Sequence, residues 1–148
     1  MLLGRTTYQI FKDYWPTATT DKDIIADELN ALSKIVVSRT LDHAPWGDRG
    51  DEVRIVRDGV EAAATLRGKS GKGVVVWGSL ALSQSLMKAS MVDEFQLYLC
   101  PNVLGAGKPL FNPDAGFASH APPRDQALRF RRDSPSLFAS GMMSVVQH

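Results

Sequence analysis

The sequence predicts a three-layer α/β domain with a mainly parallel sheet and an antiparallel hairpin at its C-terminal end. Two observations lead to this prediction. Strand-like apolar runs alternate with helical patterns between residues 34 and 100, as in parallel strands joined by helices. Two strand-like segments then follow residue 123 with only a short Ser-Pro-Ser connection between them, which favours antiparallel pairing.

Turn and cap signals place the elements of the first half of the chain. Gly4 opens a turn directly after an apolar start, and Pro16 stops the first helix. Thr20 and Asp23 resemble a capping box before a second helix. The predicted elements are the end of a strand at 1–3, a helix at 6–15, a helix with Ile25, Leu29 and Leu32 on its inner face, a strand at 34–38, a loop at 41–52 and a strand at 53–56.

The second half follows from the same patterns. Val74–Trp77 is a buried-type strand that stops at Gly78 and passes directly into a helix. Alternation in Phe95–Cys100 predicts a further strand. The predicted elements are a helix at 58–68 with Val60, Ala64 and Leu66 inward, a strand at 74–77, a helix at 80–89, a strand at 95–100, a Gly- and Pro-rich loop at 101–123, and hairpin strands at 128–133 and 137–146.

Length and composition indicate one soluble domain, residues 1–148. Of the 148 residues, 44% are hydrophobic and 22% charged, and the net charge of +1 gives no reason to expect a nucleic-acid or membrane partner. Cys100 is the single cysteine, so no internal disulfide is possible, and the three histidines lack metal-ligand spacing. With no signal peptide or membrane-length apolar run, we expect a cytoplasmic protein.

Three turns at strand ends could bind phosphate groups. The first contains Gly4, Arg5 and Thr7, where a glycine allows close approach, threonines can cap the helix and an arginine suits phosphate; the second contains Ser38, Arg39 and Thr40; the third contains Gly78 and Ser79. Because ligands of open α/β sheets bind outside the carboxyl ends of the strands, the three turns can converge on one multiply phosphorylated ligand. Each turn alone is equally compatible with an ordinary strand exit. Neither a G-x-G-x-x-G nor a Walker A pattern is present.

Five ordered motifs resemble one family, the reductase domain of bacterial riboflavin biosynthesis (the C-terminal domain of the bifunctional deaminase-reductase) and its stand-alone relatives. The motifs are Gly4-Arg5-Thr6-Thr7-Tyr8, Val37-Ser38-Arg39-Thr40-Leu41, Val76-Trp77-Gly78-Ser79, Val92-Asp93-Glu94, and the run from Pro101 to Phe111. The resemblance implies a dihydrofolate reductase-like fold, NADPH as hydride donor, a heterocyclic substrate of pyrimidine or pterin type, and a homodimer. It places Arg5 and Thr7 at the cofactor phosphates, Ser38 and Arg39 at the adenosine 2′-phosphate, and Gly78 and Ser79 at the pyrophosphate. It also makes Gly105–Lys108 a loop.

One departure from the family pattern bears on activity. Relatives carry a segment of about 35 to 40 residues, longer than an ordinary loop, before the Gly-Arg-x-Thr motif, and it supplies a central strand and most substrate contacts. Only three residues precede Gly4 here, so we expect a truncated N-terminus or a second chain that fills the gap. No residue stands out as a proton donor.

Other interpretations of the sequence stay open. A non-catalytic nucleotide-binding or dimerisation module is the main alternative to a reductase, and a hydrolase that uses Ser79 as nucleophile is a weaker one, because there is no G-x-S-x-G elbow. Trp15 and Trp46 could pack at a dimer surface or beside the adenine. Asp93 and Glu94 could act as an acid/base pair.

Overall fold

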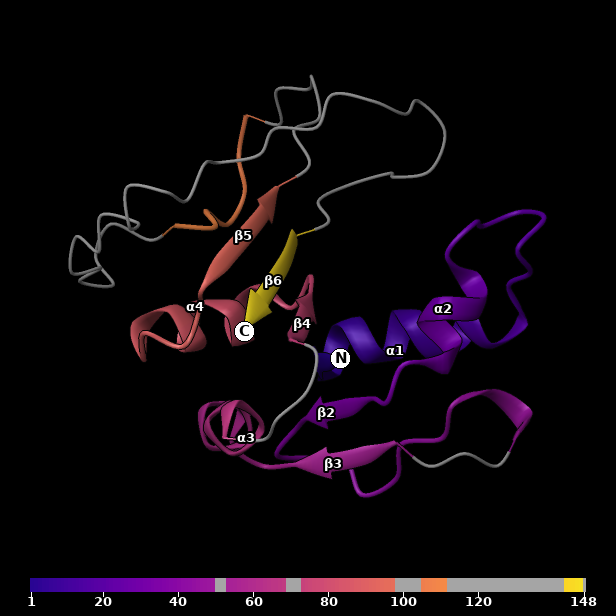
Figure 1. The fold of residues 1–148 in the computed structure, drawn as a ribbon, viewed down its shortest axis with the longest axis horizontal. Helices are drawn as coiled ribbons and strands as arrows, with labels where there is room; N and C mark the ends of the chain where they lie inside the picture. The colour runs from indigo at the N-terminus through magenta and orange to yellow at the C-terminus, as the bar shows by residue number, and fades with distance from the viewer. Residues whose placement is uncertain (50–52, 69–72, 98–104, 112–142, 148) are drawn as a thin grey trace.

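A six-stranded sheet with helices on both faces forms the described part of the chain (Figure 1). The computed structural model describes residues 1–49, 53–68, 73–97, 105–111 and 143–147. The strands are β1 (Leu2–Gly4), β2 (Ile35–Val37), β3 (Arg54–Val56), β4 (Val74–Trp77), β5 (Glu94–Leu97) and β6 (Met143–Gln147). Their order across the sheet is β3-β2-β1-β4-β6-β5.

The strand directions confirm a mainly parallel sheet with antiparallel pairing at one side. β1 pairs in parallel with β2 and β4, and β2 pairs in parallel with β3. β6 is antiparallel to both of its neighbours, with Val145 opposite Val76 of β4 and opposite Phe95 of β5. The first strand of the predicted hairpin, 128–133, lies outside the described residues. The second, predicted at 137–146, overlaps β6, which is described from Met143 and lies next to β4 in the sheet.

Helices connect the strands as predicted. They are α1 (Arg5–Tyr14), α2 (Ala26–Ala31), α3 (Gly59–Arg67) and α4 (Leu80–Lys88), with 3-10 turns η1 (Trp15–Thr17) and η2 (Gly47–Arg49). α1 and α2 lie on one face of the sheet, and α3 and α4 on the other (Figure 1). Pro16 falls within η1, directly after α1, where a missing backbone N–H costs nothing.

Each face of the sheet buries its own apolar cluster. Because side chains alternate along a strand, Leu2 points to the α3/α4 face and Leu3 to the α1/α2 face, and both are fully buried. The α1/α2 cluster contains Tyr8, Phe11, Trp15, Leu29, Val36 and Trp46; the α3/α4 cluster contains Ala63, Val76, Leu82 and Leu86. The two tryptophans, Trp15 and Trp46, are therefore core residues, which corrects both roles considered for them.

The predicted capping box before α2 is wrong. Asp23 is buried and accepts a hydrogen bond from the hydroxyl of Tyr14, while the hydroxyl of Thr20 donates to Asp27. α2 begins after Ile25 with no side-chain cap. Tertiary partners have taken the polar groups that a local cap would use.

Two predicted inner faces also need correction. In α2, Leu29 is buried and Ile25 packs against the core, but Leu32 lies beyond the helix end and is 43% exposed. In α3, Ala63 is fully buried and Ala64 is exposed. Asp58 caps α3, because its carboxylate accepts hydrogen bonds from the backbone amides of Val60 and Glu61. The helix therefore begins at Gly59, one residue later than predicted.

The segment of residues 105–111 is irregular, as expected for the predicted loop. It lies against α4, because the side-chain amide of Gln84 donates to the carbonyl of Pro109 at 2.9 Å. The aromatic rings of Phe111 and Phe95 also meet, with centroids 5.4 Å apart. The loop is thereby fixed to the helix that follows the Gly78 turn.

Candidate nucleotide-binding site

Two of the predicted turns are hydrogen-bonded to each other. The backbone N–H of Gly4, at the end of β1, donates to the hydroxyl of Ser79 at 2.8 Å. In return, the backbone N–H of Ser79 donates to the hydroxyl of Thr7 at 3.1 Å. The Ser79 hydroxyl also lies 3.0 Å from the Thr7 hydroxyl and 3.0 Å from the carbonyl of Trp77. These bonds form a clasp between the start of α1 and the start of α4.

The backbone of the third turn is left-handed at two successive residues. Gly78 has φ +57° and Ser79 has φ +54°. A left-handed serine costs about 1–2 kcal/mol, and such strained residues gather at functional sites. Glycine also favours the close approach of the two turns, because a Cβ at Gly4 would make a tight contact of 3.3 Å with the Cβ of Ser79.

Both helices begin without a side-chain cap. Gly4 precedes α1 and Ser79 precedes α4, and neither position has a side chain bonded to the first turn of its helix. This corrects the expectation that a threonine caps α1, because the Thr7 hydroxyl instead accepts from Ser79. The unpaired amides of a helix N-terminus carry partial positive charge. The clasp therefore holds two such ends together at one edge of the sheet, an arrangement that suits an anion.

The second turn, which carries Arg39, is bonded to the first turn. Arg5 donates from its guanidinium to the Thr40 hydroxyl at 3.1 Å, which joins the first turn to the turn after β2. Arg39, next to Thr40, is exposed. Ser38 is buried at 5% exposure, and its hydroxyl accepts from the amides of Thr40 and Leu41 at 3.3 and 3.1 Å. Arg5 and Arg39 thus follow the ends of two neighbouring parallel strands and supply two guanidinium groups at this edge of the sheet.

The turn after β2 is fixed from behind by residues that the sequence analysis did not single out. Arg57, at the exit of β3, donates to the carbonyls of Ser38 and Leu41 at 2.9 and 2.8 Å. The Tyr8 hydroxyl of α1 donates to the carbonyl of Pro45 at 2.6 Å. No local sequence signal identifies these contacts, since each joins segments at least 16 residues apart.

A second anchor holds the same loop through a tryptophan. The indole N–H of Trp46 donates to the side-chain oxygen of Asn30 at 2.8 Å, and the Asn30 amide donates to the carbonyl of Trp15. The ammonium of Lys34 lies 4.4 Å from the centre of the Trp46 ring, a cation–π contact. The loop from Ser38 to Trp46 is therefore held at both ends.

The structure brings together the eight predicted site residues at one edge of the sheet. Direct bonds join Gly4, Thr7 and Ser79, and another joins Arg5 to Thr40. The hydroxyls of Thr7, Ser38 and Ser79 are already used to shape the turns, so positive charge for an anion comes from amides and arginines. The partners found for the Ser79 hydroxyl are a hydroxyl, an amide and a carbonyl, none of which is a base that could activate a nucleophile.

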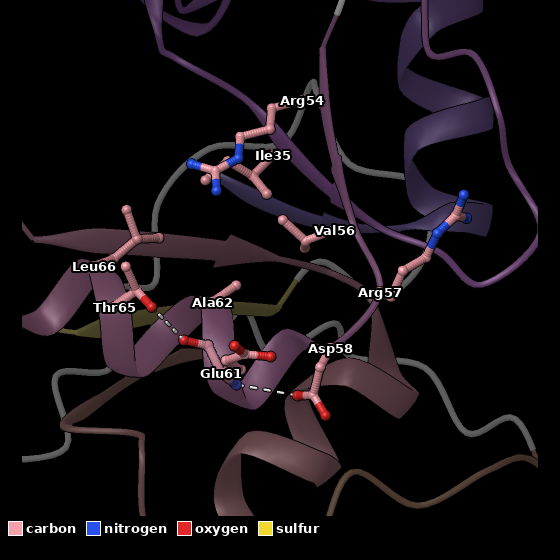
Figure 2. A pocket seen from close by; sticks show the side chains of 9 residues that line it. All are labelled: Ile35, Arg54, Val56, Arg57, Asp58, Glu61, Ala62, Thr65 and Leu66. Carbon is pink, nitrogen blue, oxygen red and sulfur yellow. Dashed lines mark hydrogen bonds between the residues drawn. The ribbon is translucent and has the colours of Figure 1, made fainter.

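A pocket of about 260 Å³ lies between β3 and α3, to one side of these turns (Figure 2). Its floor is apolar, and its rim carries Arg54, Arg57, Asp58 and Glu61. Asp58 caps α3 there, as Figure 2 shows through its bond to the Glu61 amide. Arg57 belongs both to this rim and to the support of the Ser38 turn.

The other titratable residues considered from the sequence lie outside the clasp between α1 and α4. Asp93 forms an ion pair with Arg67 of α3, and Glu94 begins β5 on the side of the sheet away from the clasp. His43 is exposed. Within the described ranges, no group of three or more His, Cys, Asp or Glu side chains is placed to bind a metal ion. No described helix is long and apolar enough to cross a membrane.

Comparison with known proteins identifies the family. A profile of the RibD C-terminal domain matches residues 1–139. The chain belongs to this family. Its three-layer architecture is accordingly the dihydrofolate reductase-like fold. The family is associated with a reductase-like role in riboflavin biosynthesis. The chain is also similar to the uncharacterized protein YyaP of Bacillus subtilis (strain 168), with 26% identity over all of this chain and 72% of YyaP.

Proposed function

We propose that the protein is an NADPH-dependent reductase that transfers hydride to a heterocyclic substrate of pyrimidine or pterin type. The clasp between the starts of α1 and α4, with two arginines beside it, is the observation that carries this proposal. Membership of the RibD C-terminal domain family supports the reductase class. A homodimer is part of the same proposal and is checked by light scattering of the purified protein.

The chain's own residues fit the parts of a phosphorylated dinucleotide. The two uncapped helix ends would hold a pyrophosphate, since the free amides of a helix N-terminus carry partial positive charge. Arg39 and the Ser38 turn would hold a 2′-phosphate, which a guanidinium binds through paired N–H groups, and Arg5 would lie at the cofactor phosphates. Arg57 and Tyr8 keep the Ser38–Thr40 turn in place.

NADPH, when bound, supplies a hydride for the substrate. The protein's part is to bind the cofactor in one orientation and to place the substrate beside it. The described residues contribute fixed amides and cations at the phosphate end, so we assign them to binding. We name none of them as the proton donor.

Thermal melting with NADPH, NADH and ATP tests cofactor binding. A ligand at about 100 times its dissociation constant adds about 2.7 kcal/mol of stability, which is a clear rise in melting temperature. We expect NADPH to raise the melting temperature more than NADH at equal concentration. Equal shifts with all three nucleotides would contradict an NADPH site.

Turnover separates an enzyme from a binding module. NADPH oxidation is followed at 340 nm with the 6-ribosylamino derivative of 5,6-diaminouracil and with dihydropterins as acceptors. Oxidation that depends on the acceptor supports the reductase. NADPH binding with no oxidation across this series would favour the non-catalytic module instead.

A further inference from the structure

Trp77 carries a buried hydrogen-bond donor that has no acceptor in the part of the chain that the structure describes. Among the residues the structure describes, its indole N–H is the buried side-chain polar group without a partner. The comparable N–H of Trp46 is paired with Asn30 at 2.8 Å. Buried polar groups in folded proteins are almost always hydrogen-bonded, so an orphan donor calls for a specific explanation.

The position of Trp77 is next to the candidate nucleotide site. It is the last residue of β4 and directly precedes Gly78. Its ring meets the ring of Phe11 edge to face, with centroids 6.0 Å apart and an interplanar angle of 71°. Phe11 lies one helical turn beyond Thr7, the residue of the clasp. Trp77 is therefore one turn of α1 away from the phosphate end of the site.

Trp77 also lies at the edge of the part of the sheet that α1 and α2 cover. Its neighbour Val76 belongs to the α3/α4 cluster, whereas Trp77 packs against the α1/α2 cluster. α1 packs over β1 and β2, and no described helix covers β6 and β5 on this face (Figure 1). Trp77 as a whole residue is partly buried, whereas its indole nitrogen is buried.

We infer that the indole N–H of Trp77 donates a hydrogen bond to a ring carbonyl or ring nitrogen of the substrate, and that its ring contacts the face of that planar heterocycle. The inference rests on the proposed function, because it takes the ligand to be the heterocyclic substrate of the proposed reductase. The inference requires the indole to turn so that its N–H, which is buried in the free protein, meets the ligand. Such a donor selects substrates that offer an acceptor, since an analogue without one leaves the N–H unpaired.

The variant Trp77→Phe tests this inference, because it removes the N–H and keeps an aromatic ring. The probes are 5,6-diaminouracil and 7,8-dihydrobiopterin, titrated by calorimetry into protein saturated with NADP⁺ and into protein alone. We expect Trp77→Phe to weaken binding of these probes about tenfold, the loss of one hydrogen bond with part of the ring contact. NADPH affinity is expected to stay within about twofold of wild type.

Stability provides the matched control. Trp46→Phe also removes an indole N–H, but it leaves the side chain of Asn30 without its donor, so we expect a lower melting temperature. Trp77→Phe removes an unpaired donor and is expected to leave the melting temperature of the free protein unchanged or raised. Unchanged probe affinity in Trp77→Phe, or wild-type protein that binds neither probe, would overturn the inference. A failure to bind NADPH would instead count against the proposed function and is read in its own titration.

Discussion

Replacing Ser79 by alanine perturbs the clasp at its centre. The hydroxyl accepts from the Gly4 amide at 2.8 Å, so its loss leaves a half-buried N–H unpaired. It also removes the contact with the Thr7 hydroxyl. Leaving a buried donor unsatisfied costs about 1–3 kcal/mol, and we expect Ser79→Ala to lower the free energy of unfolding by that amount.

Ser79→Gly separates the hydroxyl from the backbone strain. It loses the same hydrogen bonds but relieves a left-handed φ of +54°, so it should be more stable than Ser79→Ala by about 1 kcal/mol. Urea unfolding measures both, through a midpoint shift at constant slope. Ser85→Ala, an exposed hydroxyl on α4 bonded to the Ala81 carbonyl, is the control and should change stability by less than about 0.5 kcal/mol. If Ser79→Ala matched that control, the clasp would not join the two turns.

Three further perturbations test the parts of the fold around the site. Gly59→Ala places a Cβ 2.4 Å from a methyl of Leu82, so we expect a loss of about 1–3 kcal/mol in urea unfolding; a neutral change would contradict this packing. The hydrogen bond to Asp23 raises the pKa of Tyr14 above its ordinary value of 10.0, so the bond's stabilisation is present below pH 10.0 and is lost as pH rises through the raised pKa. Absorbance titration near 295 nm should show the ionisation of Tyr14 moving to lower pH in Asp23→Asn, and an unchanged titration would refute the coupling. Asn30→Ala strips the partner from a buried indole and should cost about 1–3 kcal/mol by chemical unfolding, whereas wild-type stability would show that the loop is anchored elsewhere.

Local patterns predicted the elements around the site well. Val74–Trp77 has the predicted bounds, because a run of β-branched residues that ends at glycine leaves little choice of structure. The following helix differs from the prediction by one residue at its end. The convergence of three turns followed from a rule of parallel sheets rather than from any one motif.

Long-range contacts account for what the sequence could not show. Thr20 and Asp23 have the spacing of a capping box, but Tyr14 lies within reach in the fold and takes the carboxylate. Arg57 has no local feature that marks it, yet it supports the turn of Ser38 across 19 residues. The place of β6 next to β4 is likewise a pairing between distant segments, which periodicity does not reveal.

The most direct test of the account is the affinity for NADPH compared with NADH, measured by calorimetry in wild type and in Arg39→Ala. A hydrogen-bonded charge pair contributes about 1.5–3 kcal/mol, so Arg39→Ala should weaken NADPH about 10- to 150-fold and leave NADH nearly unchanged. Arg54→Ala, an exposed arginine on β3 at the opposite end of the strands, is the control and should alter neither. Equal weakening of both nucleotides by Arg39→Ala, or no binding of NADPH to the wild type, would contradict the assignment of the three turns to one cofactor site.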